Sequence, residues 1–203
     1  MDVIERVQPV VLVGGRSRRF GRDKLREPLG GGLLIDRPIA ALRAVFGRCV
    51  ALVGDCDPAV ATRGDSHLAD GFPGMGPIGG IVTALDVFGC AVFVLPGDLP
   101  SVTATGVRAV LEAAAAETGA AAVVGATARI EPCFGVYRPQ CENTLRRAIA
   151  GTRLELWRLV EQERWTTVPL PVSEVININT IRDFESATGA CPQPPIADMG
   201  RSG

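Results

Sequence analysis

The chain has 203 residues, of which 47% are apolar, and a formal net charge of −1. This length fits one folded domain, and the apolar content excludes a largely disordered chain. The near-zero charge provides no general surface for nucleic acid or membrane lipids, and no apolar run of about 18 residues is present to span a bilayer.

Two further features of the sequence concern the cellular compartment. The six cysteines include no Cys-x-x-Cys pair and mostly lie in apolar runs. We therefore expect reduced core cysteines rather than disulfides or a zinc site. The opening Met-Asp-Val-Ile-Glu-Arg lacks a basic-then-apolar leader. Together these features predict a cytoplasmic protein.

The first predicted element is a buried strand at residues 8–13, followed at once by a glycine-rich basic loop. Gly14 and Gly15 allow a sharp turn and let a ligand approach the backbone N–H groups. Four arginines and Lys24 follow within nine residues, which favours a polyphosphate ligand. The spacing fits neither a Walker loop nor a dinucleotide fingerprint. A glycine turn with a solvated arginine run is the alternative.

Downstream, apolar periodicity, caps and breakers predict alternating helices and strands, with a Gly-, Asp- and Pro-rich loop at 54–76. Asp36 and Thr103 are expected N-caps, and Thr152-x-x-Glu155 and Thr180-x-x-Asp183 are expected capping boxes. The predicted helices are 36–46, 77–88, 103–118, 139–149, one from 152 with apolar positions Leu154, Trp157, Leu159 and Val160, and a short one from 180. The remaining predicted strands are 49–53, 90–95, 120–124, 133–137, 168–170 and 175–178.

This order of elements predicts a single α/β domain, a Rossmann-like three-layer sandwich with a mainly parallel sheet covered by helices. Ligands of such sheets bind at the carboxyl ends of the strands, where the basic loop lies. We expect the domain to occupy residues 1–189 and the Pro-rich tail at 190–203 to be disordered.

Asp98 is the leading candidate for a metal ligand. It follows a buried strand across Pro96 and Gly97, so it should lie at the same edge of the sheet as the glycine loop. Magnesium in phosphoryl transfer often takes only one or two carboxylates from the protein, with phosphates and water completing its shell. The alternative is that Asp98 only stabilises the Pro-Gly-Asp-Leu-Pro turn.

The opening motif carries a family resemblance. Leu12-x-Gly-Gly-x-Ser-x-Arg-x-Gly-x-Asp-Lys24 resembles the signature of the MobA-like nucleotidyltransferases, and most closely that of the molybdenum cofactor guanylyltransferases. Val13 and Phe20 replace the usual alanine and methionine, and both changes are apolar. The resemblance implies a nucleotide-diphospho-sugar transferase-like fold. It also implies that the nucleotide is bound by Leu12, Val13, Gly14, Gly15, Arg16 and Lys24.

Further stretches extend the resemblance to about residue 188. Leu95-Pro-Gly-Asp-Leu-Pro100 resembles the element whose aspartate binds magnesium, here Asp98, and Asp70-x-x-Pro-Gly-x-Gly-Pro77 resembles one whose aspartate helps hold the nucleotide. Asp65 is a nearby rival for the role of Asp70. Arg129-Ile-Glu-Pro132 resembles a stretch on the side of the second substrate, with no role assigned to Glu131. Asn177-Ile-Asn179-Thr180 resembles the family's Asn-x-Asn-Thr, which implies that an asparagine such as Asn179 orients a metal ligand or a phosphate. The alternative is that Asn179 only shapes the turn before the last helix.

One position departs from the family pattern. Gly54 stands where some relatives have a polar residue, such as asparagine, that contacts the nucleotide. A glycine offers no side chain for this contact, so the groups that recognise guanine stay undefined.

The resemblance implies a Mg²⁺-dependent enzyme that transfers GMP from GTP to molybdopterin, forming molybdopterin guanine dinucleotide and pyrophosphate. Lys24 and Asp98 are the implied catalytic residues, with Asp98 as the metal ligand. Molybdenum-inserting proteins and molybdoenzyme chaperones are implied partners. Alternatives are a cytidylyltransferase or sugar-phosphate nucleotidyltransferase on the same fold, or a non-catalytic protein that binds molybdopterin or nucleotide. The second glycine, Gly15, together with Asp23 and Lys24, favours the guanylyl branch over the cytidylyl branch.

Overall fold

The computed structural model describes residues 7–14, 20 and 23–189. Its central feature is a seven-stranded sheet in which, of the strands described, only β8 runs antiparallel to its neighbours. In spatial order the strands are β5 (Ser66–Leu68), β4 (Ala51–Val53), β1 (Val7–Leu12), β6 (Ala91–Pro96), β8 (Ile130–Tyr137), β7 (Ala122–Ala126) and β9 (Thr166–Pro169). A separate short hairpin consists of β2 (Pro28–Leu29) and β3 (Gly32–Leu33). The predicted α/β class with a mainly parallel sheet is confirmed.

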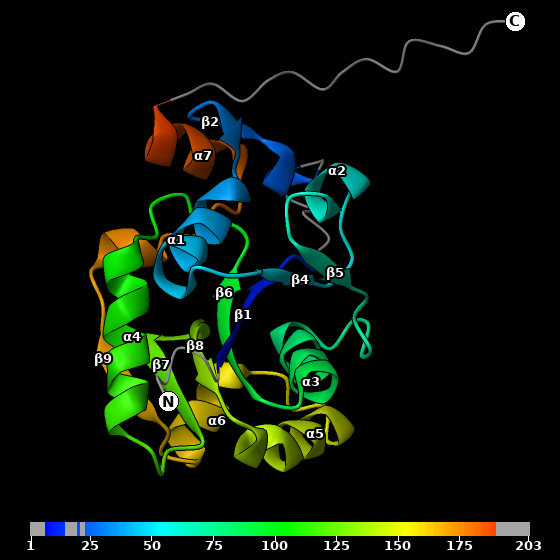
Figure 1. The fold of residues 1–203 in the computed structure, drawn as a ribbon, viewed down its shortest axis with the longest axis vertical. Helices are drawn as coiled ribbons and strands as arrows, with labels where there is room; N and C mark the ends of the chain where they lie inside the picture. Colours follow the sequence, from blue (N-terminus) through cyan, green and yellow to red (C-terminus); the bar gives the residue numbers. More distant parts are fainter. Residues whose placement is uncertain (1–6, 15–19, 21–22, 190–203) are drawn as a thin grey trace, which may run out of the picture.

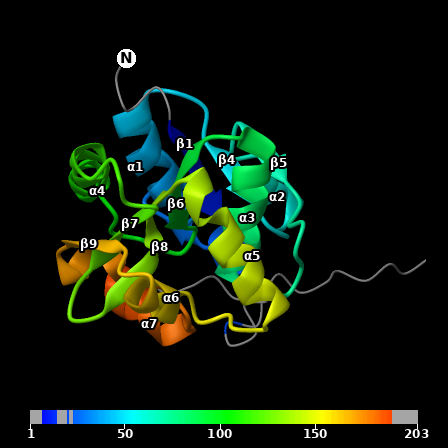
Figure 2. The same cartoon turned by 90° about the horizontal axis from the view of Figure 1, so that it is seen from below.

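Helices cover both faces of this sheet (Figures 1 and 2). Because side chains alternate along a strand, neighbouring residues enter different cores. Val11 and Leu95 pack into one core, and Val10 and Val94 pack into the other. The first core is covered by α1 (Asp36–Phe46) and α4 (Ala104–Ala116), and the second by α3 (Pro77–Phe88), α5 (Glu142–Ala150) and α6 (Leu156–Gln162). The chain therefore forms the expected three layers.

A third, smaller core lies beyond the carboxyl ends of the strands. Phe20, Leu34, Ile178 and Phe184 are buried together, and the rings of Phe20 and Phe184 meet edge to face with centroids 6.5 Å apart. Phe184 belongs to α7 (Ile181–Thr188), which Figure 1 shows beside β2 at the end of the molecule towards which β1 and β6 run. This packing brings the end of the described chain next to Phe20.

Several helix ends are those that the sequence predicts. Thr103 caps α4 by accepting from Gly106 N, and Thr180 and Asp183 form a capping box at α7. Two predicted caps are wrong. Asp36 is the first residue of α1 rather than its N-cap, because its carboxylate accepts from Leu33 N instead. No capping box forms at Thr152, which has a φ of 53°, so α6 begins without a side-chain cap.

The strand predictions need several corrections. The predicted strand 168–170 is β9 at Thr166–Pro169, and the short strands β2 and β3 were not predicted. β8 begins at Ile130 rather than 133, since pairing continues to Ala126 beyond a register shift after Val124. The predicted 54–76 loop contains α2 (Pro58–Ala61) and the edge strand β5, which is too short for a periodic signal. Residues 175–178 form no strand. The 3-10 turn η4 (Val172–Val175) ends there, and Ile178 N donates to Asp98 O outside any ladder.

The cysteine prediction is wrong for the location, and the reduced state stays a prediction. The five cysteines in the described part of the chain are free, but only Cys141 is fully buried, and Cys49 is exposed. The reason is that most of them lie at the ends of apolar runs rather than within them. Cys191 and the tail at 190–203 lie outside the described residues, so the disordered tail stays a prediction.

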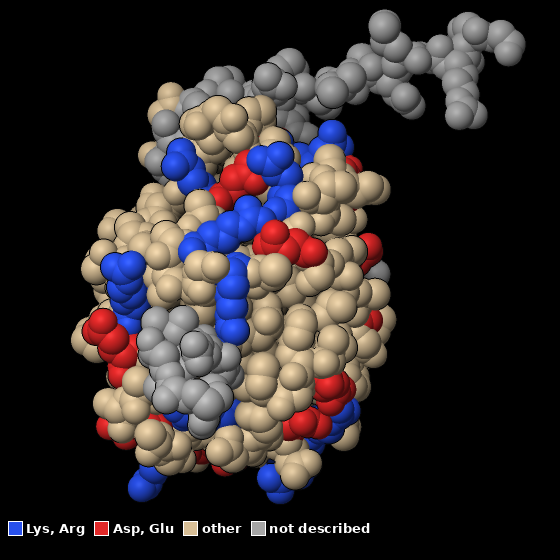
Figure 3. Space-filling model, in the orientation of Figure 1, with Lys and Arg blue, Asp and Glu red and all other residues tan. Residues whose placement is uncertain are grey.

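The surface of the described domain mixes charges of both signs. Figure 3 shows Lys and Arg side chains interspersed with Asp and Glu on one face. Three Arg–Asp ion pairs tie α1, α2 and the neighbouring loops together: Arg26–Asp57, Arg43–Asp65 and Arg63–Asp36. Across the described segments, every helix is too short or too polar to cross a membrane.

Candidate active site

A cleft of about 1800 Å³ opens along the carboxyl ends of the parallel strands. It is lined by the residues that end β1, β4 and β6, by the loop before α3, by the turn between β7 and β8, and by residues 175–179. The cleft contains seven of the predicted binding residues, namely Leu12, Val13, Gly14, Lys24, Asp70, Asp98 and Asn179. Gly15 and Arg16, also predicted, lie outside the described residues.

Lys24 and Asp98 form the central ion pair of this cleft. Lys24 Nζ lies 2.5 Å from Asp98 Oδ2 and also donates to Ile178 O at 2.5 Å, with Asn179 Oδ1 at 3.4 Å. The side chains of Lys24 and Asp98 are only 16% and 15% exposed. The sequence motif therefore brings a cation and a carboxylate together where few water molecules can screen them.

The position of Lys24 is fixed by the turn that carries it. Lys24 opens the short 3-10 turn η2 (Lys24–Arg26), and Asp23 caps this turn by accepting from Leu25 N at 3.0 Å. The second carboxylate oxygen of Asp23 accepts from Asp57 N at 3.2 Å, which ties the turn to α2. Asp23 therefore positions Lys24, and this role explains an aspartate directly before the lysine.

The backbone of Asp98 is held from both sides. Gly97 N donates to Leu12 O at 3.0 Å, and Ile178 N donates to Asp98 O at 3.0 Å. A side chain at Gly97 would meet Ile35 and Leu25 at 3.0–3.1 Å, so the strand end packs closely there. Within the described chain, the Asp98 carboxylate accepts from Lys24 and from no N–H of its own turn. The geometry thus does not support the alternative in which Asp98 only holds a turn.

Asn177 is a residue to which the sequence assigned no individual role. Its Oδ1 is buried, lacks a hydrogen-bond partner among the described residues, and belongs to the lining of the cleft. A buried acceptor without a partner is unfavourable, so such an atom suggests a ligand contact. Asn177 is two residues from Asn179, and the pattern Asn-x-Asn was the only signal that could have identified it.

The oxygen atoms of Asp98 and Asn177 are the candidates for holding a metal ion. Carboxylate and amide oxygens suit Mg²⁺, which needs few protein ligands when phosphates supply the rest. No group of three or more His, Cys, Asp or Glu residues gathers into a metal site in the part of the chain that is described. The donors present therefore fit a magnesium ion shared with a nucleotide better than a self-contained protein site.

Gly14, which follows β1 and precedes a gap in the described residues, lies against the end of β4. Gly54 has a φ of +128°, and a Cβ there would lie 2.5 Å from Gly14 N. The carbonyl of Gly54 is 2.7 Å from His67 Nε2. The glycine that departs from the family pattern is therefore required by the close approach of two strand ends. Asp55, exposed and lining the cleft, is the first residue after it that carries a side chain.

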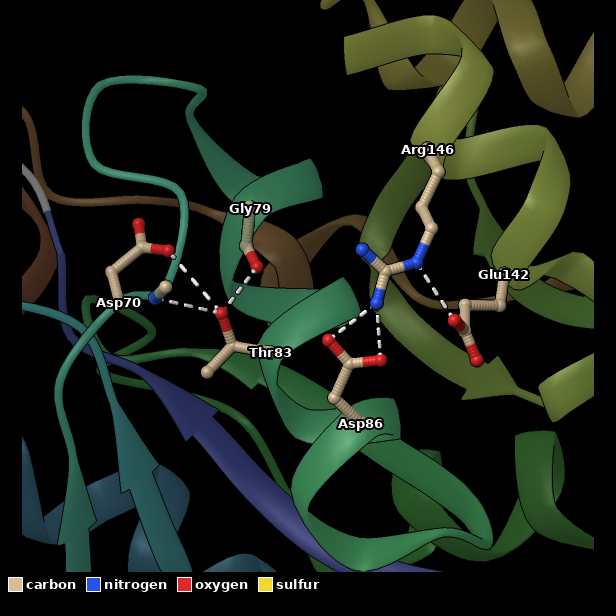
Figure 4. Close-up of polar contacts among 7 residues, drawn as sticks. Asp70, Gly79, Thr83, Asp86, Glu142 and Arg146 are labelled. Atoms are coloured by element: carbon tan, nitrogen blue, oxygen red, sulfur yellow. Dashed lines mark hydrogen bonds and ion pairs between the residues drawn. The ribbon is translucent and has the colours of Figure 1, made fainter. Parts of the chain in front are cut away.

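Asp70 is held at the cleft by Thr83 of α3, as Figure 4 shows. Asp70 Oδ1 accepts from Phe72 N at 2.8 Å and lies 3.4 Å from Thr83 Oγ1. Thr83 Oγ1 also accepts from Gly71 N at 3.0 Å and donates to Gly79 O at 2.8 Å. The loop between Asp70 and α3 is thus fastened to the helix through a buried hydroxyl.

A second contact supports the same loop from α5. The guanidinium of Arg146 lies 5.4 Å from the centroid of the Phe72 ring. Arg146 forms an ion pair with Asp86 of α3, and its Nε donates to Glu142 Oε1 at 2.7 Å (Figure 4). Phe72 therefore packs beneath a side chain that is itself held by two carboxylates.

Asp65, the rival of Asp70, has a different role. It accepts from Val50 N at 2.8 Å and pairs with Arg43 at 2.9 Å. The hydrogen bond from Val50, and then that from Arg43, lowers the pKa of Asp65 below its usual value. Asp65 ties β5 to α1 and is not among the cleft residues, so the geometry favours Asp70 as the ligand-binding residue.

The turn between β7 and β8 forms the opposite wall. Glu131 accepts from Arg129 Nε at 3.1 Å and from Thr127 Oγ1 at 3.4 Å, so its carboxylate is used within the turn. Cys133 also lines the cleft, but burial, with smaller contributions from Asp98 and Glu131, raises the pKa of its thiol to about 12. A thiol with this pKa is a poor nucleophile.

A cleft at the carboxyl edge of a mainly parallel sheet, with Gly14 at the end of its first strand and a mostly buried lysine–aspartate pair, is typical of proteins that bind a nucleotide phosphate. The comparison with known proteins narrows this class. The model of the MobA-like NTP transferase domain matches residues 9–167, and the chain therefore belongs to this nucleotidyltransferase family.

Individual relatives agree with the family assignment. A probable molybdenum cofactor guanylyltransferase of Opitutus terrae is 31% identical over 81% of this chain and 84% of its own length. A molybdenum cofactor guanylyltransferase of Mesorhizobium japonicum is 34% identical over 68% of this chain and 69% of its own. The crystal structure of molybdopterin-guanine dinucleotide biosynthesis protein A from Archaeoglobus fulgidus superimposes with a TM-score of 0.69 at 27% identity, covering 90% and 97% of the two chains.

Proposed function

We propose that this protein transfers GMP from GTP to molybdopterin, forming molybdopterin guanine dinucleotide and releasing pyrophosphate. The family and the names of the relatives support guanylyl transfer. The observation in this chain that carries the proposal is the Lys24–Asp98 pair, 2.5 Å apart and mostly buried in a cleft large enough for two substrates.

In the proposed reaction, a terminal phosphate oxygen of molybdopterin attacks the α-phosphorus of GTP in line. The bond from that phosphorus to the bridging oxygen breaks, and pyrophosphate leaves with the bond electrons. Lys24 neutralises the negative charge that builds up on the phosphates. The turn η2, capped by Asp23, would keep its ammonium in place before the substrate arrives and so avoid reorganisation during the reaction.

The proposal includes magnesium as the cofactor. Asp98 would hold the ion, with Asn177 Oδ1 as a second oxygen donor; a bound Mg²⁺ supplies charge neutralisation of the phosphate oxygens. Leu12, Val13, Gly14, Gly15 and Arg16 would bind the nucleotide together with Lys24. Asp70 would contact the nucleotide from its fastened loop, and Asn179 would orient Lys24, whose Nζ is 3.4 Å from its Oδ1.

We also propose a cytoplasmic location, where GTP is available and where the free cysteines stay reduced. Molybdenum-inserting proteins and molybdoenzyme chaperones would then be partners before and after the reaction. The cytidylyl, sugar-phosphate and non-catalytic alternatives predict other ligands. No observation in the described structure favours them over guanylyl transfer.

A nucleotide panel followed by a turnover assay tests the proposal. Binding of GTP, CTP, ATP and dTTP is measured by calorimetry with and without magnesium, and pyrophosphate release is then measured with GTP and molybdopterin. We expect magnesium-dependent binding that favours GTP, and pyrophosphate release only when both substrates are present. Preference for CTP would support the cytidylyltransferase alternative, and preference for dTTP would support the sugar-phosphate nucleotidyltransferase alternative. GTP binding without turnover would support the non-catalytic binding protein.

A further inference from the structure

A tryptophan lies exposed in the wall of the cleft. The periodicity of the sequence predicts Trp157 as an apolar position of its helix, yet its side chain is 43% exposed. Leu156, Leu159 and Val160 of the same helix are buried instead. Trp157 also lines the cleft. An exposed indole in a concave site is a surface on which a flat ligand can bind.

The other tryptophan of the chain shows what a structural role looks like. Trp165 is 8% exposed and packs edge to face against Tyr137, with ring centroids 5.9 Å apart. Trp157 has no such place in the core. The aromatic-ring contact that the structure shows for it is the guanidinium of Arg158, 5.1 Å from the ring centroid. Core packing therefore accounts for Trp165 and leaves Trp157 unexplained.

A carboxylate lies on the same face of the helix. Glu161 follows Trp157 by four residues, which places the two side chains one above the other on α6. Glu161 is exposed and, like Trp157, lines the cleft. An aromatic surface and a carboxylate acceptor on one wall can bind a planar ring that carries hydrogen-bond donors on its edge.

The order of the strands shows which half of the cleft this wall serves. The glycine turn and Gly54 follow β1 and β4, and Asp98 follows β6 in the middle of the sheet. On the far side of β6 lie β8, β7 and β9, and α6 packs against β8 (Figure 2). Thr167 of β9 and the turn after β7 line the cleft here as well. Trp157 and Glu161 therefore belong to the half opposite the nucleotide loop.

Ligand chemistry follows from these two side chains. A 2-amino-4-oxo ring presents a ring N–H and an amino group side by side, and a carboxylate accepts both as a bidentate pair. Pterins and guanine share this edge. Trp157 and Glu161 lie on the side of Asp98 away from Gly14, so a pterin bound there and a guanine bound beside Gly14 would occupy opposite halves of the cleft.

We propose that Trp157 and Glu161 form the subsite for the pterin ring of the second substrate. The ring stacks on the indole face away from Arg158, and Glu161 accepts from its N3–H and 2-amino groups. This inference rests on the proposed function for the identity of the second substrate. It places the pterin on the β8 side, the nucleotide on the β1 side and Asp98 between them.

The test measures pterin binding without any transfer reaction. The intrinsic fluorescence anisotropy of 6-hydroxymethylpterin is followed as the full-length protein is added, for the wild type and for Trp157→Leu, Trp157→Phe, Glu161→Gln and Glu163→Gln. Stacking and a charged hydrogen bond lead us to expect binding weaker by about tenfold or more in Trp157→Leu and Glu161→Gln. Trp157→Phe should retain most of the affinity. Glu163, exposed on the same helix end but outside the cleft lining, is the matched control and should change nothing.

Competition with GMP separates the two rings. If GMP displaces the pterin, and Trp157→Leu weakens GTP binding to the same extent, the subsite recognises guanine and the inference is wrong. It is equally wrong if the wild type does not bind the pterin, or if Trp157→Leu and Glu161→Gln bind it normally. Pyrophosphate release from GTP and molybdopterin is assayed separately. If the wild type binds the pterin through Trp157 and Glu161 but releases no pyrophosphate, the proposed function is contradicted and the inference about the pterin subsite is not.

Discussion

Lys24 and Asp98 are 74 residues apart in the sequence, yet Lys24 Nζ lies 2.5 Å from Asp98 Oδ2. Lys24 follows β1 and Asp98 follows β6. These two strands are parallel, and a hydrogen bond from Gly97 N to Leu12 O joins their ends. The pair connects the turn η2 to the end of β6 in the middle of the sheet.

Our first prediction concerns this pair. Asp98→Asn should lower pyrophosphate release by at least about a hundredfold, because it removes the carboxylate charge that would hold the metal ion at the phosphates. Lys24→Met should have a similar effect, and the double variant should be little worse than either single one, since the two residues act as a unit. Steady-state kinetics with GTP and molybdopterin measures this.

The control for that experiment is Glu117→Gln, which neutralises an exposed carboxylate at the end of α4, outside the cleft lining. It should leave turnover unchanged. Thermal unfolding of all variants checks that the fold persists. Additive effects of the two substitutions would contradict a shared role.

The second prediction concerns the loop that carries Asp70. Thr83→Val keeps the shape of the side chain but removes the hydroxyl that contacts Gly71 N, Gly79 O and Asp70 Oδ1. We expect KM for GTP to rise by about three- to tenfold with a smaller change in kcat, and the free energy of unfolding to fall by about 1–3 kcal/mol. Thr83→Ser should restore KM. A variant with normal KM for GTP would show that the loop does not need this support.

The family and the architecture could be predicted from the sequence because their signals are local. Buried strands appear as apolar runs, and the motif around Lys24 is continuous along the chain. The roles of Asn177 and Trp157 could not be predicted from the sequence in this way. The unpartnered oxygen of Asn177 depends on packing from distant segments, and the helical period that includes Trp157 does not reveal that its side chain faces a cleft instead of the core.

Gly54 is a second position whose role could not be predicted from the sequence. The motif comparison marks it as a missing polar contact, whereas the structure shows a position where a Cβ would lie 2.5 Å from Gly14 N. Such a close approach of two strand ends cannot be seen in either strand alone. The same holds for the wrong capping box at Thr152, where a local pattern was overridden by the turn that leads into α6.

The third prediction follows from that close approach. Gly54→Ala should lower the free energy of unfolding by about 3 kcal/mol or more and should also weaken GTP binding, because the displaced backbone is that of the glycine turn. The matched control is Gly31→Ala. Gly31 also has a positive φ, +85°, but a Cβ there meets nothing within 4 Å.

We therefore expect a loss of about 1 kcal/mol for Gly31→Ala, from backbone conformation alone, with GTP binding unchanged. Chemical denaturation and calorimetric titration give both quantities. Equal losses of stability in the two variants would show that the contact with Gly14 contributes nothing.

The fourth prediction concerns acid stability. The hydrogen bond from Val50 N, and then that from Arg43, lowers the pKa of Asp65 in the folded state. A carboxyl group with a lower pKa when folded contributes stability above its unfolded pKa of about 4, and this contribution is lost as the pH falls through the folded value. Stability should thus decrease below about pH 4.

Asp65→Asn isolates the contribution of this carboxylate to the pH dependence. The variant should be less stable than the wild type at pH 7, and the difference should shrink as the pH falls below about 4, because the wild-type carboxylate is then protonated too. Urea unfolding at a series of pH values between 7 and 3 measures the difference directly. A gap between the two proteins that stays constant over this range would mean that the charge of Asp65 does not stabilise the junction of β5 and α1.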